Sequence, residues 1–263
     1  MANKFAGGDP DYIRTTQYGT PEKLSARQRL HSRYRTAPVR WFEWMAAEIP
    51  WQPGTVVEVG CGPGDFWDEA RPPIDGRVVL TDLSAGMVAA AIGRARGAGY
   101  DAEGRVAPAQ SLPIVDAAAA HVVSNHMLYH VPHPPDGVAE MARIVADDGL
   151  VTVATNGENH MAELKQIERA VFDTDVADST VRAFGLENGR AMLEAHFESV
   201  ELRATDPQHV VDYLSSYPPG EDATASQYDA MRSLVDAGFA AGDGVFTIRK
   251  DAGMYLCRGP RRG

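Results

Sequence analysis

A single turn constrains this chain most. The apolar strand candidate Val56–Val59 runs directly into the glycine-rich segment Gly60–Gly64. Glycines at such a turn adopt positive φ and let the backbone approach a ligand closely. The next apolar strand ends at Asp82, which stands 18 residues after Gly64. That interval suits a carboxylate that binds the two hydroxyls of a ribose. The turn and the acid together predict a ribose-containing ligand at the carboxyl ends of parallel strands.

Strand and helix patterns alternate through the centre of the chain. Apolar strand signals lie near Thr55–Val59, Arg77–Thr81, Arg105–Ala107, His121–Ser124 and Leu150–Ala154, with helical or turn segments between them. Later strand signals follow near Ser199–Arg203, Val245–Arg249 and Met254–Cys257. This order predicts an α/β fold with a doubly wound, mostly parallel seven-stranded sheet.

We expect one integrated domain with three parts. Residues 1–50 would form an N-terminal helical lid, with a first helix over Pro21–Arg35. Residues 51–157 would form the ligand-binding α/β core. Residues 158–263 would combine a helical insertion, which builds the acceptor site, with the final core strands. The length of 263 residues is near the upper end of what one hydrophobic core supports.

Composition excludes several classes. A net charge of −11 opposes nucleic-acid binding, since that binding depends on cationic side chains. No apolar run is long enough to span a membrane, and residues 1–11 lack the features of a secretion signal, so we expect a cytoplasmic protein. The only two cysteines, Cys61 and Cys257, are expected to be small buried side chains. The histidines show no metal-ligand spacing, so no metal is predicted.

A dinucleotide is the obvious competing ligand, because the same architecture binds NAD. The dinucleotide fingerprint needs a third glycine five residues after the first, where this chain has Asp65. A carboxylate there is unsuited to a pyrophosphate at a helix N-terminus. Glu58, two residues before Gly60, instead fits a site for S-adenosylmethionine. The dinucleotide hypothesis is therefore the weaker one.

The motifs resemble those of class I S-adenosylmethionine-dependent methyltransferases, particularly small-molecule enzymes of bacterial antibiotic and natural-product pathways. Val56–Gly64 is similar to the first motif of the family, and Trp67 to an aromatic residue in the helix after it. Thr81–Met87 is similar to the ribose motif. The resemblance implies that the cofactor contacts the following residues of these motifs: Glu58, Gly60, Cys61, Gly62, Gly64, Asp82, Leu83 and Met87.

A third matching segment, Ala109–Pro113, would surround the adenine in such enzymes. The resemblance assigns that role to Ala109 and Gln110. Pro108 departs from the family, which usually has an Asp there that bonds the adenine amine. A second departure is His121, at the start of the fourth strand, which we expect to be structural.

The segment after the fourth strand, Ser124–His133, should lie beside the transferred methyl, because ligands bind at the carboxyl ends of parallel strands. We predict His126 as the first candidate for a catalytic base, with His130 and Tyr129 as the second candidates. Each could instead pack or form a structural hydrogen bond. We expect Asn125 to contact the methionine part of the cofactor and His133 to be structural.

In the related enzymes an N-terminal helical segment closes over the cofactor and the acceptor. The candidates here are Tyr12, Tyr18, Arg27 and His31. We place Tyr18 and Arg27 among the cofactor-binding residues, and Arg27 shares a helix face with His31. Packing of an N-terminal arm onto the sheet is the alternative.

The resemblance implies methyl transfer from S-adenosylmethionine to a nitrogen or oxygen of a small metabolite, with S-adenosylhomocysteine as the product. Three alternatives stay open: methylation of a protein, of a nucleic acid or of a carbon centre. A fourth alternative is a protein that keeps the cofactor pocket without catalysis and regulates another enzyme. The sequence leaves open both the acceptor and the oligomeric state, which includes a homo-oligomer.

Overall fold

The computed structural model describes residues 10–12, 15–16, 39–172, 176–205, 224–241 and 252–261. The predicted helix over 21–35 and the predicted strand over 245–249 lie outside these ranges. So do three of the lid candidates, namely Tyr18, Arg27 and His31.

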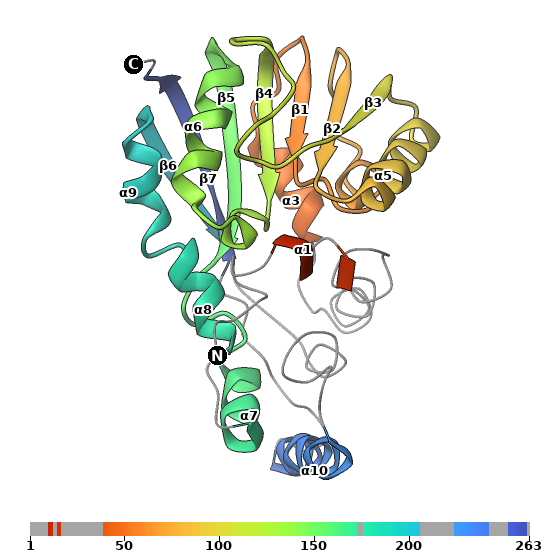
Figure 1. Cartoon of the computed structure of the whole chain (residues 1–263), viewed down its shortest axis with the longest axis vertical. Coiled ribbons are helices and arrows are strands. Elements are labelled where there is room, and N and C mark those ends of the chain that lie inside the picture. Colours follow the sequence, from red (N-terminus) through yellow and green to blue (C-terminus); the bar gives the residue numbers. More distant parts are fainter. Residues whose placement is uncertain are drawn as a thin grey trace.

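The described residues form one sheet with the strand order β3-β2-β1-β4-β5-β7-β6 (Figure 1). Strands β1 to β5 are parallel to one another, and β7 is antiparallel to both β5 and β6. The predicted fold class is thereby confirmed. The strands are β1 (Val56–Val59), β2 (Val78–Asp82), β3 (Ala102–Val106), β4 (Ala119–Asn125), β5 (Val145–Asn156), β6 (Phe197–Thr205) and β7 (Ala252–Pro260).

Helices cover both faces of the sheet, as a doubly wound fold requires. One face carries α3 (Trp41–Glu48), α4 (Asp65–Glu69) and α5 (Ala85–Gly97), and the other carries α6 (Pro134–Ile144) and α9 (Gly189–Glu194). The remaining helices are α1 (Pro10–Tyr12), the 3-10 turn η3 (Leu128–His130), α7 (Ala162–Phe172), α8 (Val176–Ala183) and α10 (Ala225–Ala241).

The central strands are buried on both faces, which explains why β1 is apolar at every position except Glu58. Alternate residues of the strands point to opposite sides and create two hydrophobic cores. On one side Val56 packs with Phe66 and Trp67 of α4. On the other side Val57 packs with Met141 of α6. The two cores fix β1 and β4 at the middle of the molecule.

The direction of winding reverses between β1 and β4. The chain passes from β1 to β2 on one side, and returns to pair β4 with the other side of β1. Val59, the last residue of β1, is in register with Thr81 and with Ser124. A crevice at the carboxyl ends of the strands is expected at such a switch point. The residues that follow β1, β2 and β4 therefore meet there.

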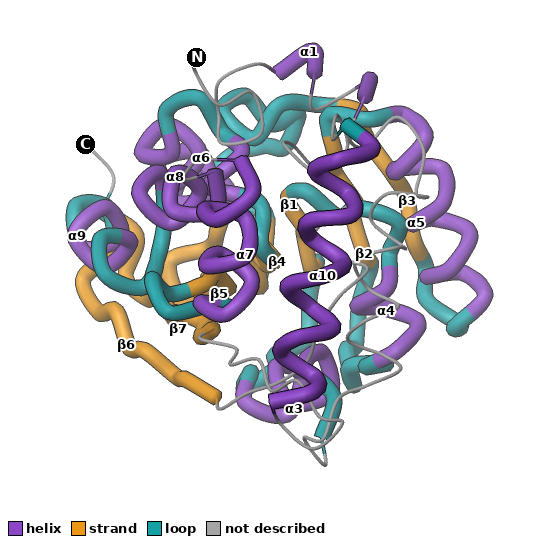
Figure 2. Tube along the Cα trace, turned by 90° about the horizontal axis from the view of Figure 1, so that it is seen from below, coloured by secondary structure: helices purple, strands orange, loops and turns teal. Residues whose placement is uncertain are grey.

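Helices α7, α8 and α10 lie beyond the carboxyl ends of the parallel strands (Figure 1). Figure 2 looks onto that end of the sheet, and α10 crosses in front of β1 and β2. Helix α10 packs on α7, where Met231 and Val235 are buried side chains of α10. This is the region that the sequence analysis assigned to an acceptor site.

Several boundaries differ from the predictions. Strand β3 covers Ala102–Val106 and not Arg105–Ala107, because an edge strand with exposed charges lacks the apolar run that marks a buried one. Strand β5 begins at Val145, directly after α6, although Asp147–Gly149 reads as a turn. Helices α8 and α9 are short elements within residues 158–263, where the sequence predicted a helical insertion.

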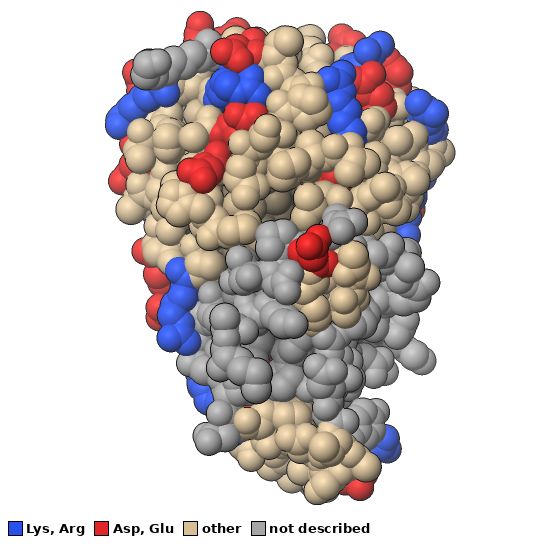
Figure 3. Space-filling model, in the orientation of Figure 1, with Lys and Arg blue, Asp and Glu red and all other residues tan. Residues whose placement is uncertain are grey.

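Charged side chains of both signs are interspersed over the upper half of the face in Figure 3, which is the amino end of the parallel strands. In the described part of the chain no helix is long and apolar enough to cross a membrane. Likewise, the described residues contain no group of three or more His, Cys, Asp or Glu side chains that could hold a metal ion.

Candidate active site

The glycine-rich turn after β1 has the positive φ angles that its sequence predicts. Gly60, Gly62 and Gly64 have φ values of 70°, 50° and 87°. A Cβ at Gly60 would lie 2.6 Å from Cγ of Met127, and a Cβ at Gly64 would lie 2.6 Å from Cα of Ala91. Both contacts are too short for any other residue. These two glycines therefore let the turn pack closely against the segment after β4 and against α5.

Glu58 lies beneath this turn and is almost completely buried. Its Oε2 accepts a 2.6 Å hydrogen bond from Nε1 of Trp67, and its Oε1 accepts a 2.9 Å hydrogen bond from Nδ2 of Asn125. Burial raises the pKa of Glu58 to about 8, although these two hydrogen bonds lower it. Both donors are neutral groups. The site is therefore one where a bound cation would stabilise the carboxylate.

Asp82 ends β2 beside the same turn. Its Oδ2 accepts a hydrogen bond from the Gly62 amide at 3.0 Å, and its Oδ1 accepts one from the Ser84 amide at 2.8 Å. Burial raises the pKa of Asp82, and the backbone hydrogen bonds oppose that shift. A carboxylate oxygen can accept more than one hydrogen bond. Asp82 is thus held in place while each oxygen keeps capacity for a hydroxyl donor.

Asp65 occupies the position where a dinucleotide fingerprint has its third glycine. It begins α4 and forms an ion pair with Arg94 of α5. The ion pair keeps a carboxylate at the N-terminus of α4, where a pyrophosphate would have to bind. The structure therefore disfavours an NAD site, as the sequence does.

The residues assigned to the adenine come from two segments. Ser84 caps α5 by accepting a hydrogen bond from the Met87 amide, and Met87 is fully buried. Ala109 is buried and Gln110 half-buried in the loop after β3. Among the described residues, the amides of Ala109 and Gln110 have no internal hydrogen-bond partner. They remain available as donors to a ligand.

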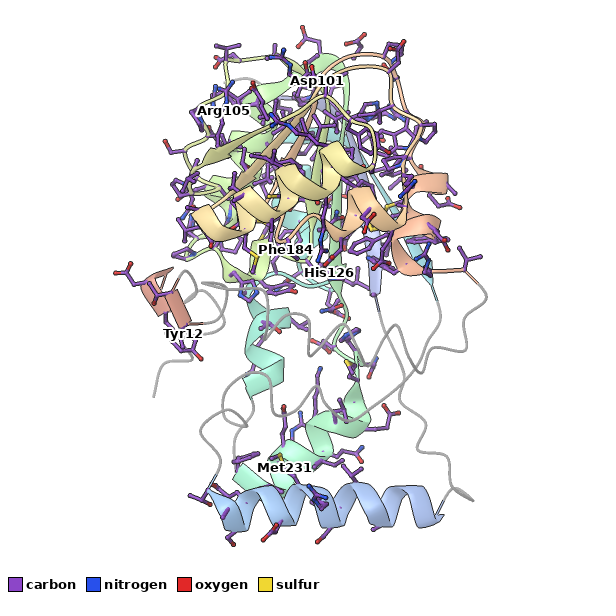
Figure 4. All side chains as sticks on the ribbon, turned by 90° about the vertical axis from the view of Figure 1, so that its right-hand side faces the viewer. Tyr12, Asp101, Arg105, His126, Phe184 and Met231 are labelled. Atoms are coloured by element: carbon purple, nitrogen blue, oxygen red, sulfur yellow. The ribbon has the colours of Figure 1, made fainter. Side chains whose placement is uncertain are left out.

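His126 follows β4 with a left-handed backbone, at a φ of 53°. Such a conformation is uncommon for a residue other than glycine and is frequent at functional sites. The imidazole packs against the indole of Trp41, with ring centroids 5.2 Å apart. Figure 4 labels His126 at the end of the sheet opposite Asp101. The structure thus places His126 at the carboxyl ends, as the sequence predicted.

Three polar atoms at this edge are buried without a hydrogen-bond partner among the described residues. They are Oδ1 of Asn125, Oγ of Ser124 and Nε1 of Trp41. Buried polar atoms are nearly always paired in native proteins, so unpaired ones indicate a missing ligand or water. Sequence reasoning identified Asn125 but missed Trp41, because nothing in its local pattern separates it from the neighbouring aromatic residues Phe42 and Trp44.

The other candidates for a base lie in η3. The ring centroids of Tyr129 and His130 are 4.6 Å apart with an angle of 66° between the ring planes, and both side chains are half-buried. His133 is exposed and its Nδ1 lies 2.9 Å from Oδ1 of Asp136. His121 lies near the amino end of β4, where its Nε2 accepts a 2.7 Å hydrogen bond from the Gln52 amide. Burial lowers the pKa of His121 to about 4, so it is neutral at physiological pH.

Two further residues were predicted from the sequence, Cys61 as a cofactor contact and Tyr12 as part of the lid. The side chain of Cys61 is buried and its amide donates to the Thr81 carbonyl, so that amide is not available to a ligand. Tyr12 lies in α1, which is at the carboxyl end of the sheet (Figure 1). The roles of Cys61 and Tyr12 stay predictions, as does the assignment of Leu83.

Comparison with known proteins agrees with this geometry. Residues 57–153 match the methyltransferase domain family. The malonyl-[acyl-carrier protein] O-methyltransferase of Geobacter sulfurreducens is 31% identical over 181 residues, which are 64% of this chain and 63% of that protein. The match thus spans less than two-thirds of the curated relative.

Two solved structures share the fold. One is phosphoethanolamine N-methyltransferase 2 of Haemonchus contortus in complex with S-adenosyl-L-methionine, with a TM-score of 0.59 at 15% identity. The superposition covers 96% of this chain and 60% of the Haemonchus chain. A methyltransferase from an antibiotic biosynthesis pathway of Anabaena variabilis has a TM-score of 0.58 at 14% identity, over 81% and 95% of the two chains. At these identities the likeness concerns the fold alone.

Residues 57–153 thus match a methyltransferase domain, and the described residues share the fold of class I S-adenosylmethionine-dependent methyltransferases. S-adenosylmethionine is the methyl donor of that class. The fold predicted from the sequence is therefore shared with these enzymes, while the cofactor of this chain stays a proposal.

Proposed function

We propose that the chain binds S-adenosylmethionine at the carboxyl ends of β1, β2 and β4, and transfers its methyl group to a nitrogen or oxygen of a small molecule. The observation that carries the proposal is the pair of unpaired buried atoms on Asn125 and Trp41. An acceptor and a donor at the same edge complement the ammonium and carboxylate of an amino acid.

The other parts of the cofactor fit the residues beside this pair. Asp82, anchored by two backbone amides, has capacity for both ribose hydroxyls. The amides of Ala109 and Gln110 can donate to the adenine. Glu58 holds Asn125 through its amide nitrogen and thereby directs Oδ1 of Asn125 away from itself. Glu58 is a positioning residue in this account.

Charge supports a cationic cofactor. The buried carboxyl groups Glu58 and Asp82 both have raised pKa values, mainly because of burial. A nearby positive charge favours the ionised form of each. S-adenosylmethionine, when bound, supplies a methyl group whose bond to sulfur breaks as a lone pair of the acceptor bonds to the carbon, which leaves S-adenosylhomocysteine. The chain then has to hold the two reactants in line, which contributes on the order of 7–11 kcal/mol.

The acceptor would bind between the edge of the sheet and the helices α7, α8 and α10, which lie beyond it. His126 is placed to receive the proton that a neutral nitrogen or oxygen nucleophile loses, with His130 and Tyr129 as alternatives. The solved neighbours include an N-methyltransferase of a small phosphorylated amine and a protein of an antibiotic pathway. Their names agree with the small acceptor proposed here, whereas the curated relative acts on a malonyl-[acyl-carrier protein]; a protein, a nucleic acid or a carbon centre is the alternative.

The test uses the full chain with methyl-labelled S-adenosylmethionine and extract of the source organism, followed by mass spectrometry of labelled products. We expect label in a small molecule. Label in protein or nucleic acid only would overturn the acceptor class. Tight binding of S-adenosylhomocysteine with no transfer to any fraction would instead favour a regulatory protein that binds the cofactor without catalysis.

A further inference from the structure

The loop that would contact the adenine is fastened by two side chains of α6, Glu140 and Arg143. Glu140 Oε1 accepts a 2.7 Å hydrogen bond from the Leu112 amide. Arg143 donates to the Leu112 carbonyl at 3.1 Å and to the Ile114 carbonyl at 2.8 Å. Its Nη1 also lies 2.5 Å from Oδ1 of Asp116. Glu140 and Arg143 therefore hold the loop at Leu112, Ile114 and Asp116, and we call this pair of side chains the clamp.

Glu140 and Arg143 also hold each other. Arg143 donates from Nε to Oε2 of Glu140 at 2.8 Å and from Nη2 to Oε1 at 2.6 Å. Two parallel hydrogen bonds between a guanidinium and a carboxylate fix the orientation of both groups. The pair lowers the pKa of Glu140 and raises that of Arg143, chiefly through these hydrogen bonds. Glu140 is mostly buried, so the pair is less screened than a surface ion pair.

The clamp leaves few backbone donors for a ligand. The Leu112 amide binds Glu140, the Ser111 amide binds the Pro108 carbonyl, and the Ile114 amide binds the Leu112 carbonyl. Pro108 has no amide hydrogen. Among the described residues from Pro108 to Leu112, the amides without a partner are then those of Ala109 and Gln110.

Recognition by backbone amides depends on where the backbone lies, because amides are the same in every residue. Pro108 also has no side-chain acceptor for the 6-amino group of adenine. The position of the Ala109 and Gln110 amides therefore decides which purine edge they match. Gly137 of α6 adds to this constraint, since a Cβ there would lie 3.1 Å from Leu128 and 3.8 Å from Ala109.

We infer that Glu140 and Arg143 are positioning residues for purine recognition: they hold the loop after β3 so that the Ala109 and Gln110 amides select adenine over a 6-oxopurine. This inference rests on the proposed function, because it takes S-adenosylhomocysteine as a ligand of the site. Adenine N1 accepts a hydrogen bond, whereas N1 of hypoxanthine carries a hydrogen. An amide placed at that edge therefore distinguishes the two bases.

The test compares calorimetric dissociation constants for S-adenosylhomocysteine and S-inosylhomocysteine. The wild-type chain should prefer the adenine ligand. Arg143→Lys should weaken S-adenosylhomocysteine binding roughly tenfold, the effect of about one lost hydrogen bond, and should change S-inosylhomocysteine binding much less. The preference for adenine should therefore fall. A general structural role would weaken both ligands equally.

The matched control is Arg190→Lys. Arg190 of α9 likewise binds a carboxylate, that of Glu194, and a backbone carbonyl, that of Val200, but away from the loop. The Arg190→Lys variant should bind S-adenosylhomocysteine and S-inosylhomocysteine with the same preference as the wild-type chain. If Arg143→Lys does not fold, Glu140→Gln keeps an acceptor for Leu112 while it removes the charge, and should lower the preference too.

An unchanged preference in a folded clamp variant would overturn the positioning role. Failure of the wild-type chain to bind either ligand would instead refute the proposed function. The two failures are therefore distinguishable.

Discussion

The side-chain amide of Asn125 donates a 2.9 Å hydrogen bond to Oε1 of Glu58, and its own Oδ1 is buried without a partner among the described residues. An acid on β1 thus orients an amide at the end of β4, across the point where the winding of the sheet reverses. Four of the following predictions concern this edge of the sheet.

Replacement of Asp82 should weaken cofactor binding without unfolding the chain. Asp82→Ala removes a charged hydrogen-bond acceptor, a loss of about 1.5–3 kcal/mol, or roughly 10- to 150-fold in the dissociation constant of S-adenosylhomocysteine. Calorimetry measures this, with circular dichroism as the check on folding. Asp75→Ala, at an exposed position before β2, is the control. Equal affinity in a folded Asp82→Ala variant would remove Asp82 from the site.

The raised pKa of Glu58 predicts a pH-dependent stability. In the folded chain Glu58 keeps its proton up to a pH of about 8, whereas in the unfolded chain it loses the proton above about 4.5. The folded state therefore binds more protons between these values, and the free energy of unfolding falls as pH rises through that window. The contribution is at most about 5 kcal/mol.

Urea unfolding of the unliganded chain at several pH values between 5 and 8 measures this effect. Glu58→Gln cannot ionise, so its free energy of unfolding should fall less steeply with pH than that of the wild-type chain. Parallel pH profiles for the two chains would show that Glu58 has an ordinary pKa. The comparison also cancels the contributions of titratable groups that do not interact with Glu58; Asp82 does interact with it.

Trp41→Phe should keep an aromatic ring beside His126, while it removes the unpaired N–H together with part of the indole. If Nε1 donates to the carboxylate of the cofactor, S-adenosylhomocysteine should bind roughly tenfold more weakly. Binding of 5′-methylthioadenosine, which lacks the amino-acid part, should not change. Trp44→Phe on the same helix is the control. Equal weakening of both ligands would indicate that Trp41 acts only through packing.

His126 should act on the acceptor side of the transferred methyl. Asparagine tolerates the left-handed backbone of this position but cannot serve as a base. With the acceptor identified by labelled transfer, His126→Asn should lower kcat by roughly 10²- to 10⁴-fold and leave cofactor affinity nearly intact. A raised KM with unchanged kcat would indicate a binding role, and unchanged kinetics would move the search to His130 and Tyr129.

The sequence was sufficient for the parts of this structure that depend on local pattern. The apolar run of β1, the glycine turn and the Ser84 cap are each encoded within a few residues. Trp41, Glu140 and Arg143 could not be found in that way, because their roles arise from contacts with segments far away in the chain. Arg143, for example, reads as an ordinary basic residue at the end of an amphipathic helix until Leu112 and Ile114 are seen beside it.

Edge and insertion elements were the least predictable for a related reason. Strand β3 is held by pairing with β2, and its exposed Glu103 and Arg105 do not mark it as a strand. The helices beyond the sheet depend on packing with one another, as α10 does on α7. Local propensity carries little of that information.

The central claim is that the crevice at β1, β2 and β4 binds S-adenosylmethionine. Titration of the purified chain with S-adenosylhomocysteine and, separately, with NAD tests it most directly. We predict one calorimetric binding event for S-adenosylhomocysteine, lost or strongly weakened in Asp82→Ala, and no binding of NAD, because Asp65 blocks the pyrophosphate position. Binding of NAD together with no binding of S-adenosylhomocysteine would contradict the account.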